Sequence, residues 1–471
     1  MVFNSFEFLL FFPIVCFIYY LLGKNRYRNP FLLVASYYFY MNWQPIYAVL
    51  ILTSTVLTYV CGLLVEKHAG ARKRQQAFLV AGLVLNFGIL FTFKYFNFVN
   101  ESLFCLMSYC GLRWPVPNLD VLLPVGISFY TFQAVGYSID VYRGTIRAER
   151  NFFTYALFVS FFPQLVAGPI ERAKNLLPQF HEEHAFDEDN VREGFKLMVW
   201  GYFMKLCVAD VLSPYVDAVY NNVPEHNGTS MLLATLFFTI QIYCDFAGYS
   251  SIAIGAARVM GYRLMDNFRQ PYFALDIKEF WKRWHISLST WFMDYLYIPL
   301  GGNRVPYPRL LLNLAITFLV SGIWHGANWT FVLWGGVHAM YQVGSNMFRK
   351  FVYAPKYDVW WSRVLGTFSC FVAVAFAWIF FRANDISDAF TIIEKIFCDR
   401  GPLFVDMAIF VYGMVGIALL IIKDVRERFG IGLRYMHSKY VAVRYAAVVG
   451  LISYILLFGA LTSGTFIYFQ F

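Results

Sequence analysis

The chain has 471 residues, of which 59% are hydrophobic, 20% are aromatic and only 14% are charged. Soluble domains average roughly 45–50% apolar and about 25% charged residues, and a soluble fold of this composition would expose large apolar patches to water. The composition therefore excludes an ordinary soluble domain and predicts an all-α polytopic membrane protein. The net charge of +9 is then better explained by membrane topology than by nucleic-acid binding, because Lys and Arg are enriched in the cytoplasmic loops of membrane proteins.

The first apolar run, residues 6–22, is followed by basic residues at 24–28. A cleaved signal peptide carries its positive charge before the apolar run, so we expect an uncleaved first span with its N-terminus outside. Residues 31–66 return to a second basic loop at 67–74. Two cytoplasmic ends need two crossings, and residues 41–45 are therefore predicted to form an outer turn.

Later apolar runs predict the remaining membrane segments. Residues 152–170 are interrupted by Pro163, Gly168 and Pro169, and because irregular backbone at membrane depth must be buried in protein or line a cavity, we expect a re-entrant segment there. No fixed repeat or soluble domain interrupts the chain, so we expect roughly eleven membrane segments in a single domain over residues 1–471. The other expected spans are residues 76–99, 121–142, 195–220, 229–257, 330–348, 362–381, 403–422 and 441–462.

Residues 276–341 join a basic, aromatic, amphipathic half to an almost wholly apolar half. His285 lies in the first half and His325 in the second. Ionisable side chains at membrane depth are costly and usually face a bundle interior or a cavity. The two imidazoles are therefore candidate functional groups, and the alternative for His325 is a hydrogen-bonded packing histidine between helices.

Five segments of the chain contain distinctive combinations of aromatic, glycine and polar residues. They are QLVAGPIER (164–172), CDFAGYSSIAIG (244–255), FWKRWHISLSTWF (280–292), DYLYIPLGGNR (294–304) and SGIWHGANWTFVLWGGVH (321–338). Together they resemble the membrane-bound O-acyltransferase family, above all its bacterial branch of alginate O-acetyltransferases, with the teichoic-acid D-alanyl transferases as cousins. The resemblance implies helices around a central funnel, a donor from the cytoplasm and an acceptor from outside. It also implies that His325 is the catalytic histidine and that His285 is its paired polar residue.

The chemistry of these residues agrees with acyl transfer from a thioester to an alcohol. That reaction needs a base near the hydroxyl and donors for the developing oxyanion, and imidazole exchanges a proton near neutral pH. We expect His325 to act as the base, and His285 to orient it or to stabilise the oxyanion. A covalent serine intermediate is not predicted, because the chain has no GxSxG elbow, and the histidine spacing predicts no metal site.

Four further residues are candidates for the wall of the substrate funnel or for support of the histidines. Trp324 can keep water away from the thioester. Asn328 either hydrogen-bonds His325 or caps a turn. His338 either supports the site from behind or lies at the membrane interface. Asp245, within an apolar run, either lines a cavity or forms half of a structural pair.

The basic stretch 278–283, with Arg304 and Arg309, has two interpretations. It can anchor an amphipathic helix at the membrane interface, or it can receive an anionic donor, with Lys282 and Arg283 as the binding residues. The expected donor is acetyl-CoA, and an acyl carrier protein is the alternative. Nucleotide hydrolysis is not indicated, since the chain has no Walker loop.

The last six residues, 466–471, read FIYFQF. One interpretation is an aromatic belt at the membrane interface. The other comes from resemblance to the C-terminal tail of the small single-helix partner of D-alanylation systems, in which a tyrosine is thought to carry the acyl group. Tyr468 is then a possible acyl relay between the catalytic site and a later acceptor.

We therefore predict a multi-pass O-acyltransferase of the bacterial cytoplasmic (inner) membrane. It passes an acyl group, favoured as acetyl, from a cytoplasmic thioester for O-acetylation of an exported polysaccharide such as alginate, with an extracytoplasmic hydrolase-like acetyltransferase as partner. The alternatives are D-alanyl transfer from a carrier protein to teichoic acid and, in a different class, transport of polysaccharide or lipid. A transporter would be expected to show paired repeats, and we find none. No nucleic-acid partner is expected.

Overall fold

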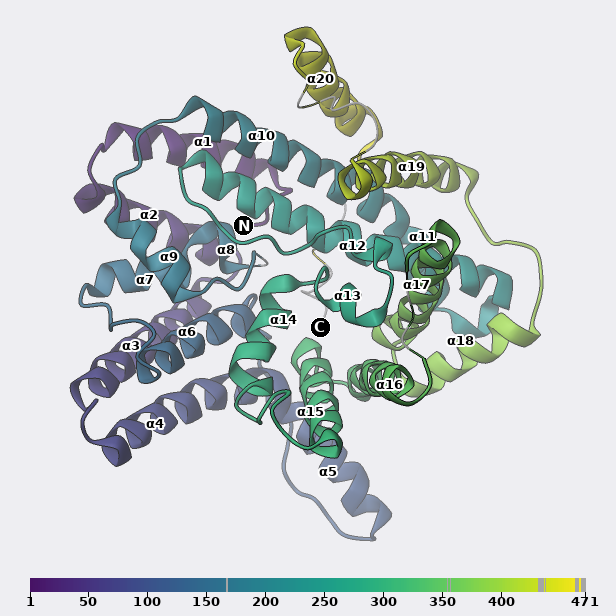
Figure 1. The fold of residues 1–471 in the computed structure, drawn as a ribbon, viewed down its shortest axis with the longest axis horizontal. Coiled ribbons are helices and arrows are strands. Elements are labelled where there is room, and N and C mark those ends of the chain that lie inside the picture. Colours follow the sequence, from purple (N-terminus) through teal and green to yellow (C-terminus); the bar gives the residue numbers. More distant parts are fainter. Residues whose placement is uncertain are drawn as a thin grey trace. The chain divides into compact units, whose positions relative to one another are not determined.

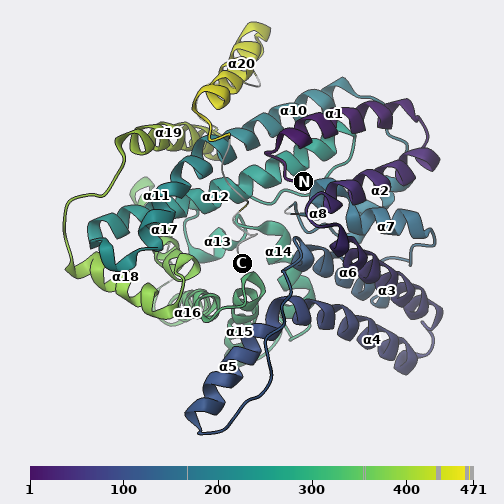
Figure 2. The ribbon, with the colours of Figure 1, turned by 180° about the vertical axis from the view of Figure 1, so that it is seen from behind.

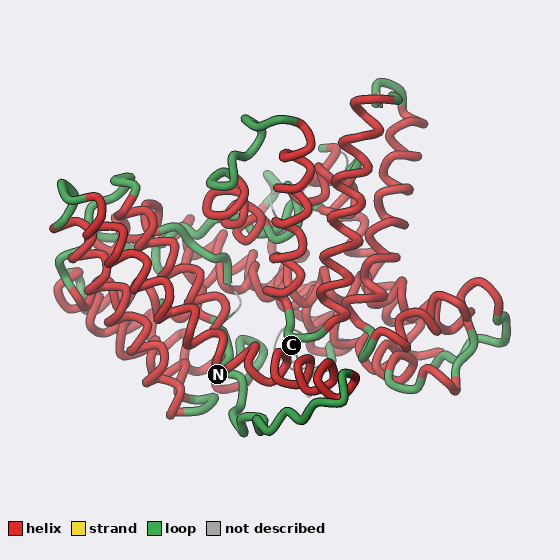
Figure 3. Tube along the Cα trace, turned by 90° about the horizontal axis from the view of Figure 1, so that it is seen from below, coloured by secondary structure: helices red, strands yellow, loops and turns green. Residues whose placement is uncertain are grey.

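The computed structural model describes most of the chain. The described residues are 1–166, 168–353, 355, 357–430, 436, 438–461 and 466. Within these ranges the regular structure is helical, and no β-strand occurs (Figure 3). The predicted all-α class is confirmed.

The chain divides into two compact units. Unit 1 comprises residues 1–194 and 253–265, and unit 2 comprises residues 195–252 and 266–471. Two helices, α10 (Glu188–Tyr202) and α12 (Gly228–Val259), have residues in both units. The single domain over residues 1–471 stays a prediction.

Unit 1 is built from the N-terminal helices, and α3, α4 and α6 lie side by side within it (Figures 1 and 2). Besides its parts of α10 and α12, it contains α1 (Phe6–Leu21), α2 (Asn25–Met41), η1 (Pro45–Tyr47), α3 (Ala48–Lys67), α4 (Arg72–Leu90), η2 (Phe91–Tyr95), α5 (Phe96–Tyr109), α6 (Ile127–Tyr142), α7 (Phe152–Ser160), α8 (Phe162–Leu165) and α9 (Ala173–His181).

Two sequence-based boundaries in unit 1 have different outcomes. The break predicted at residues 41–45 is confirmed, because α2 ends at Met41 and the next helical turn begins at Pro45. The predicted end of a span at residue 99 is wrong, since α4, η2 and α5 follow one another without a break up to Tyr109. Asn100, the first residue beyond the predicted span, lies within α5 and holds the loop that follows, donating from Nδ2 to the carbonyl oxygen of Val116 at 3.1 Å.

The segment 152–170 is broken, as the sequence predicts. Helix α7 ends at Ser160, and α8 has only four residues. The carbonyl oxygen of Phe158, near the end of α7, accepts the side-chain amides of Gln133 at 2.7 Å and Gln164 at 2.8 Å. Two amides therefore satisfy a carbonyl group near a buried helix end.

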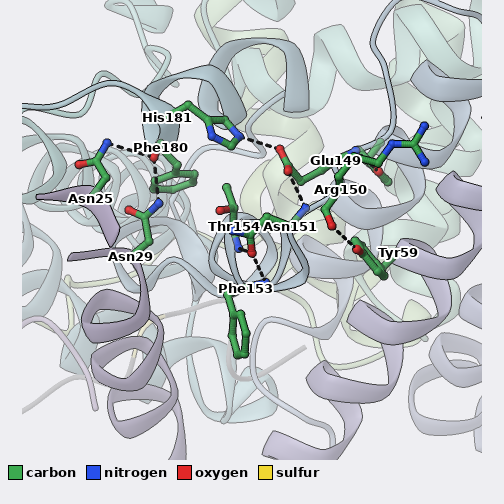
Figure 4. Close-up of polar contacts among 11 residues, drawn as sticks. Asn25, Asn29, Tyr59, Glu149, Arg150, Asn151, Phe153, Thr154, Phe180 and His181 are labelled. Carbon is green, nitrogen blue, oxygen red and sulfur yellow. Dashed lines mark hydrogen bonds and ion pairs between the residues drawn. The ribbon is translucent and has the colours of Figure 1, made fainter. Parts of the chain in front are cut away.

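Polar contacts fix the loop that precedes α7 (Figure 4). The Glu149 carboxylate lies 2.8 Å from Nε2 of His181 and accepts the backbone N–H of Asn151 at 2.8 Å. The Asn151 side chain in turn caps α7 by accepting the N–H of Phe153 at 2.9 Å. Tyr59 on α3 donates to the carbonyl oxygen of Arg150 at 2.6 Å. These bonds join the loop to α3, α7 and α9.

Unit 2 holds the central stretch of the sequence and the C-terminal helices. Besides its parts of α10 and α12, it contains η3 (Phe203–Ala209), α11 (Asp210–Tyr220), η4 (Val223–Glu225), η5 (Pro271–Phe273), α13 (Ile277–Trp281), α14 (Ile286–Phe292), η6 (Met293–Tyr297), α15 (Tyr307–His325), α16 (Trp329–Phe351), α17 (Trp360–Arg382), α18 (Ile386–Cys398), α19 (Met407–Phe429) and α20 (Val441–Phe458).

Seven helical segments of the described chain have the length and composition needed to cross a membrane. The apolar helix α1 is shorter than these seven, with 16 residues. These segments support the predicted multi-pass class, while the number of roughly eleven crossings and the central funnel stay predictions. The segments are residues 45–67, 72–109, 228–259, 307–325, 360–382, 407–429 and 441–458.

Within unit 2, helices α10 and α12 cross at very close range. A Cβ atom built on Gly201 would lie 2.6 Å from the carbonyl oxygen of Gly248, and a Cβ atom built on Gly248 would lie 2.8 Å from the carbonyl oxygen of Gly201. Just beyond this crossing, the ammonium of Lys205 lies 2.8 Å from Asp210 and 2.6 Å from Asp245. All three side chains are buried, so one ammonium balances two carboxylates away from water.

Replacing Lys205 with alanine is expected to destabilise unit 2 by about 3–5 kcal/mol, because the change leaves two buried carboxylates without their balancing cation. Thermal unfolding in detergent measures the effect. The exposed Lys278, changed to alanine, serves as the control and should unfold close to the wild-type temperature. Equal unfolding temperatures for the two variants would show that the buried ion pairs contribute nothing to stability.

Candidate active site

The turn between α15 and α16 carries His325. His325 is the last residue of α15, and α16 begins four residues later at Trp329, with the two helices packed together (Figure 1). Asn328 caps α16 by accepting the backbone N–H of Thr330 at 3.0 Å. A Cβ atom on Gly326 would lie 2.1 Å from the Phe331 ring. Glycine at this position therefore allows Phe331 to pack directly against the turn.

The His325 ring is buried among aromatic side chains. Its centroid lies 5.0 Å from that of Trp324, 4.9 Å from that of Trp334 and 5.4 Å from that of Phe381. Only 2% of His325 is exposed. The aromatic walls therefore separate this imidazole from bulk water.

His285 is held in an unusual backbone conformation just before α14. Its φ of 43° is in the left-handed region, which non-glycine residues seldom adopt and which is enriched at functional sites. The backbone is fixed next to it, because the N–H of Ile286 donates to the carbonyl oxygen of Asn267 at 2.9 Å. The imidazole is fully buried, and its Nδ1 lies 3.1 Å from Oδ1 of Asn267.

The contacts of Asn267 define the tautomer of His285. The backbone N–H of Ser287, which can only donate, faces Oδ1 of Asn267 at 3.3 Å. The Ser287 hydroxyl donates to the same oxygen at 2.9 Å, and Nδ2 of Asn267 donates to the Ser250 hydroxyl at 3.0 Å. The atom facing Nδ1 of His285 is therefore a carbonyl oxygen, so Nδ1 carries the proton and Nε2 keeps its lone pair. A neutral His285 is thus an acceptor at Nε2, which suits orientation of another group or proton uptake better than donation to an oxyanion.

The structure brings the two predicted imidazoles together. The ring centroids of His285 and His325 are 6.5 Å apart, and Trp324 lies beside both, at 5.9 Å from His285. Both histidines belong to unit 2, although the sequence separates them by most of α14 and α15. This proximity is the geometric basis for treating them as one site.

His338 is packed behind the site, with Trp334 between it and His325. The Trp334 centroid lies 4.7 Å from His338 and 4.9 Å from His325. The indole N–H of Trp281 donates to Nδ1 of His338 at 3.3 Å, and His338 is fully buried. Of the two roles predicted for His338, the geometry fits support from behind, since the side chain is surrounded by rings.

Asn328 and Asp245 have their polar groups directed to structural partners. Besides capping α16, Asn328 donates from Nδ2 to the carbonyl oxygen of Asn384 at 3.2 Å. Asp245 forms the ion pair with Lys205 described above. Asn328 thus acts as a cap and Asp245 as part of a buried pair, which are the structural alternatives that the sequence left open.

The two basic residues predicted to bind the donor differ in their surroundings. Lys282 is exposed. Arg283 is half-buried and tied to unit 2, because its guanidinium lies 2.8 Å from Glu279 and also donates to the carbonyl oxygen of Arg269 at 2.9 Å. Glu279 also pairs with Arg428 at 3.1 Å. Lys282 is therefore available to an anionic ligand, whereas Arg283 is engaged in a structural network.

The C-terminal tail is described only at Phe466, and Tyr468 lies outside the described residues. Phe466 is buried, and its ring centroid lies 4.6 Å from Tyr249 and 5.7 Å from Phe246. The Phe246 ring is in turn 4.6 Å from His285. The described part of the tail thus lies one aromatic ring away from the paired imidazoles.

Metal coordination has no candidate in the part of the chain that the structure describes, because no group of three or more His, Cys, Asp or Glu side chains is suitably placed there. The absence of a metal site stays a prediction.

Asn267 and Lys205 were not singled out by the sequence analysis. Lys205, a charge within an apolar run, carried a usable signal, whereas Asn267 lies in an irregular segment whose polarity is unremarkable.

Comparison with known proteins identifies the family. A profile of the membrane-bound O-acyltransferase family matches residues 6–383. The chain belongs to this family. It is therefore a multi-pass membrane O-acyltransferase, which confirms the resemblance found in the sequence and favours an enzyme over the transporter alternative.

Three relatives show the range of acyl transfers in the family. A probable alginate O-acetylase AlgI of Pseudomonas aeruginosa is 41% identical over 405 residues, covering 84% of this O-acyltransferase and 75% of the relative. A peptidoglycan O-acetyltransferase of Helicobacter pylori is 32% identical over 429 residues, covering 84% and 79%. The teichoic acid D-alanyltransferase of Bacillus subtilis is more distant, at 25% identity over 282 residues, covering 57% and 71%.

Proposed function

We propose that this O-acyltransferase passes an acetyl group from a cytoplasmic thioester across the membrane for O-acetylation of an exported polysaccharide such as alginate. The observation that carries the proposal is the buried pair His285 and His325, with ring centroids 6.5 Å apart. The sequence similarity to a probable alginate O-acetylase and a peptidoglycan O-acetyltransferase supports acetyl as the acyl group and a glycan as the final acceptor. The lower identity to a D-alanyltransferase makes that transfer the second candidate.

The proposed reaction assigns the two histidines different parts. His325 takes the proton from an attacking hydroxyl as its oxygen adds to the thioester carbonyl carbon. The carbon–sulfur bond then breaks, and the imidazolium of His325 returns its proton to the leaving sulfur, which departs as a thiol. His285, whose Nδ1–H is held by Asn267, offers the lone pair of Nε2 to orient the reacting groups. The rings around His325 exclude water, which would otherwise hydrolyse the thioester.

Acetyl-CoA is the proposed donor, with an acyl carrier protein as the alternative, and neither is a resident cofactor. The exposed Lys282 supports an anionic donor on the cytoplasmic side. We propose that this side is the cytoplasm, because Lys282 belongs to the basic stretch 278–283 and basic clusters favour the cytoplasmic side under the positive-inside rule. For a bacterial enzyme that acts on an exported glycan, the membrane is then the inner membrane.

Tyr468 is the proposed first acceptor of the acetyl group. Support comes from Phe466, two positions earlier, whose ring contacts Phe246 beside His285. A tethered phenol has a high local concentration at the site. Its aryl ester transfers acyl groups readily, because phenolate, with a pKa of about 10, leaves more easily than an alkoxide. An extracytoplasmic hydrolase-like acetyltransferase would then collect the group and place it on the glycan.

The decisive experiment incubates the purified enzyme in detergent with acetyl-CoA labelled in the acetyl group. We expect release of free CoA and transfer of label to the protein. A parallel sample receives a D-alanyl-loaded carrier protein. Use of the D-alanyl carrier with no turnover of any acetyl thioester would overturn the proposal in favour of D-alanyl transfer.

A further inference from the structure

A polar cavity in unit 2 is distinct from the histidine pair. Its volume is about 440 Å³, within the range of roughly 300–1,000 Å³ for small-molecule sites. We call it the Asn221 pocket. It is lined by Asp217, Asn221, Asn328, Thr330, Phe331, Phe381, Arg382, Ala383 and Asn384.

The Asn221 pocket lies where several helices of unit 2 end. Residues 217–221 close α11, Thr330 opens α16, and Arg382 closes α17. Residues 330–348 of α16 are an expected span, and Arg349 and Lys350 at its other end predict that end to be cytoplasmic. The pocket is therefore at the outer ends of these helices, on the side from which an exported glycan approaches.

The polar groups of the pocket form a connected network. The Arg382 guanidinium donates to Oδ1 of Asp217 at 2.7 Å and to Oδ1 of Asn221 at 3.4 Å. Asn384 donates from Nδ2 to the same Asn221 oxygen at 3.4 Å, and Ser213 holds the second oxygen of Asp217 at 2.9 Å. The side-chain NH₂ of Asn221 and the side-chain carbonyl of Asn384 take no part in these bonds. Donors and acceptors therefore remain side by side for a ligand.

An apolar wall connects the Asn221 pocket to the catalytic turn. The rings of Phe331 and Phe381 line the pocket and meet edge to face with centroids 4.9 Å apart. The other side of Phe381 faces His325, at 5.4 Å between centroids. A ligand in the pocket is thus separated from the catalytic imidazole by a single aromatic layer.

We propose that the Asn221 pocket binds a sugar unit of the glycan acceptor. A sugar hydroxyl both donates and accepts hydrogen bonds, and the pocket offers amides together with a guanidinium–carboxylate pair. An inorganic anion fits less well because Asp217 already balances Arg382. An acyl chain fits less well because most of the lining is polar. The proposal rests on the proposed function for the identity of the ligand as a glycan.

The pocket has a consequence for the order of transfer. A glycan chain seated at the outer ends of α11, α16 and α17 lies on the same side as the emerging acetyl group. The partner that collects the acetyl group then meets the glycan on the enzyme itself, which raises the local concentration of the sugar hydroxyl for the final transfer. The membrane enzyme, and not the extracytoplasmic partner alone, would select which sugar is acetylated.

Equilibrium binding to the full-length enzyme in detergent tests the proposal. The probes are short alginate oligosaccharides and short N-acetylglucosamine oligosaccharides, with polyethylene glycol of similar length as the non-sugar control. We expect one sugar series to bind to the wild type and Asn221→Ala to bind it about tenfold more weakly, the effect of losing one or two hydrogen bonds. The matched control is Asn222→Ala, since Asn222 adjoins Asn221 at the end of α11, is also exposed and does not line the pocket.

Two results would overturn the pocket assignment. One is the absence of binding by either sugar series, and the other is equal weakening by Asn221→Ala and Asn222→Ala. A third result would also overturn the assignment: if Asn221→Ala bound the sugar as the wild type does but no longer bound the soluble partner, the pocket would be a protein contact surface. Turnover of labelled acetyl-CoA by the same wild-type sample separates the two proposals. Turnover without sugar binding leaves the proposed function intact, and sugar binding without turnover leaves the pocket intact.

Discussion

Replacing His325 with alanine is expected to lower acyl transfer by about 10²–10⁴-fold, the usual contribution of a general base. The physical reason is that the attacking hydroxyl loses the imidazole proposed to take its proton, and the rings of Trp324, Trp334 and Phe381 beside it carry no base. Release of CoA from acetyl-CoA and label on the protein measure the loss. His285→Ala should lower the rate by a smaller but still large factor, because His325 retains its own imidazole.

Several variants separate a chemical effect from a folding effect. His325→Ala empties a volume within an aromatic core, which costs stability by itself. His325→Gln keeps most of that volume without a base and should be equally inactive. His226→Ala, on a loop of unit 2 where the ring contacts Phe404 at 4.6 Å, should retain full activity. Wild-type transfer by a well-expressed His325→Ala enzyme would refute the assignment of His325 as the base.

The histidine pair could be predicted from the sequence because its signal is local. His325 stands out as an ionisable residue in an apolar run, and the motif around His285 is continuous in sequence. Helix geometry then determines that α15 places His325 at its end. The distance between the two rings could not be predicted from the sequence, because it depends on how residues 266–286 fold back within unit 2.

The partners of the predicted residues were beyond sequence analysis for a different reason. The bond from His285 to Asn267 and the ion pair from Lys205 to Asp245 join residues that are 18 and 40 positions apart. Such pairs depend on tertiary packing, and neither periodicity nor hydropathy indicates which polar residue meets which. The tautomer of His285 depends on Asn267, so its chemical role also became accessible only with the structure.

Errors in the helix boundaries have physical causes too. The span predicted to end at residue 99 continues as α5 past Asn100, whose polar side chain is satisfied by the following loop at Val116. Helix α18 was not predicted, since its 13 residues are too short for a membrane span and hydropathy analysis searches for longer runs. Its cap is nevertheless typical of a helix start, with Asp385 accepting the N–H of Asp388 at 2.8 Å.

Replacing Tyr468 with phenylalanine is expected to abolish acetylation of the glycan while the enzyme still folds and inserts. The change removes a single oxygen and keeps the ring, so an aromatic tail that serves only as an anchor would be unaffected. If the phenol is the first acceptor, the variant has no oxygen to attack the thioester and no aryl ester to pass on. Mass spectrometry of the C-terminal peptide after incubation with acetyl-CoA measures the acetyl group directly.

The matched control for Tyr468→Phe is Tyr440→Phe, because Tyr440 is an exposed tyrosine just before α20. It should leave both peptide acetylation and glycan acetylation unchanged. His325→Ala with an intact tail should lack the acetylated peptide, which orders the steps: the imidazole acts before the phenol is acylated. Glycan acetylation at the wild-type rate by Tyr468→Phe would show that the tail is an anchor. The glycan hydroxyl would then have to reach the thioester itself, and the Asn221 pocket, one aromatic layer from His325, would be the place from which it does so.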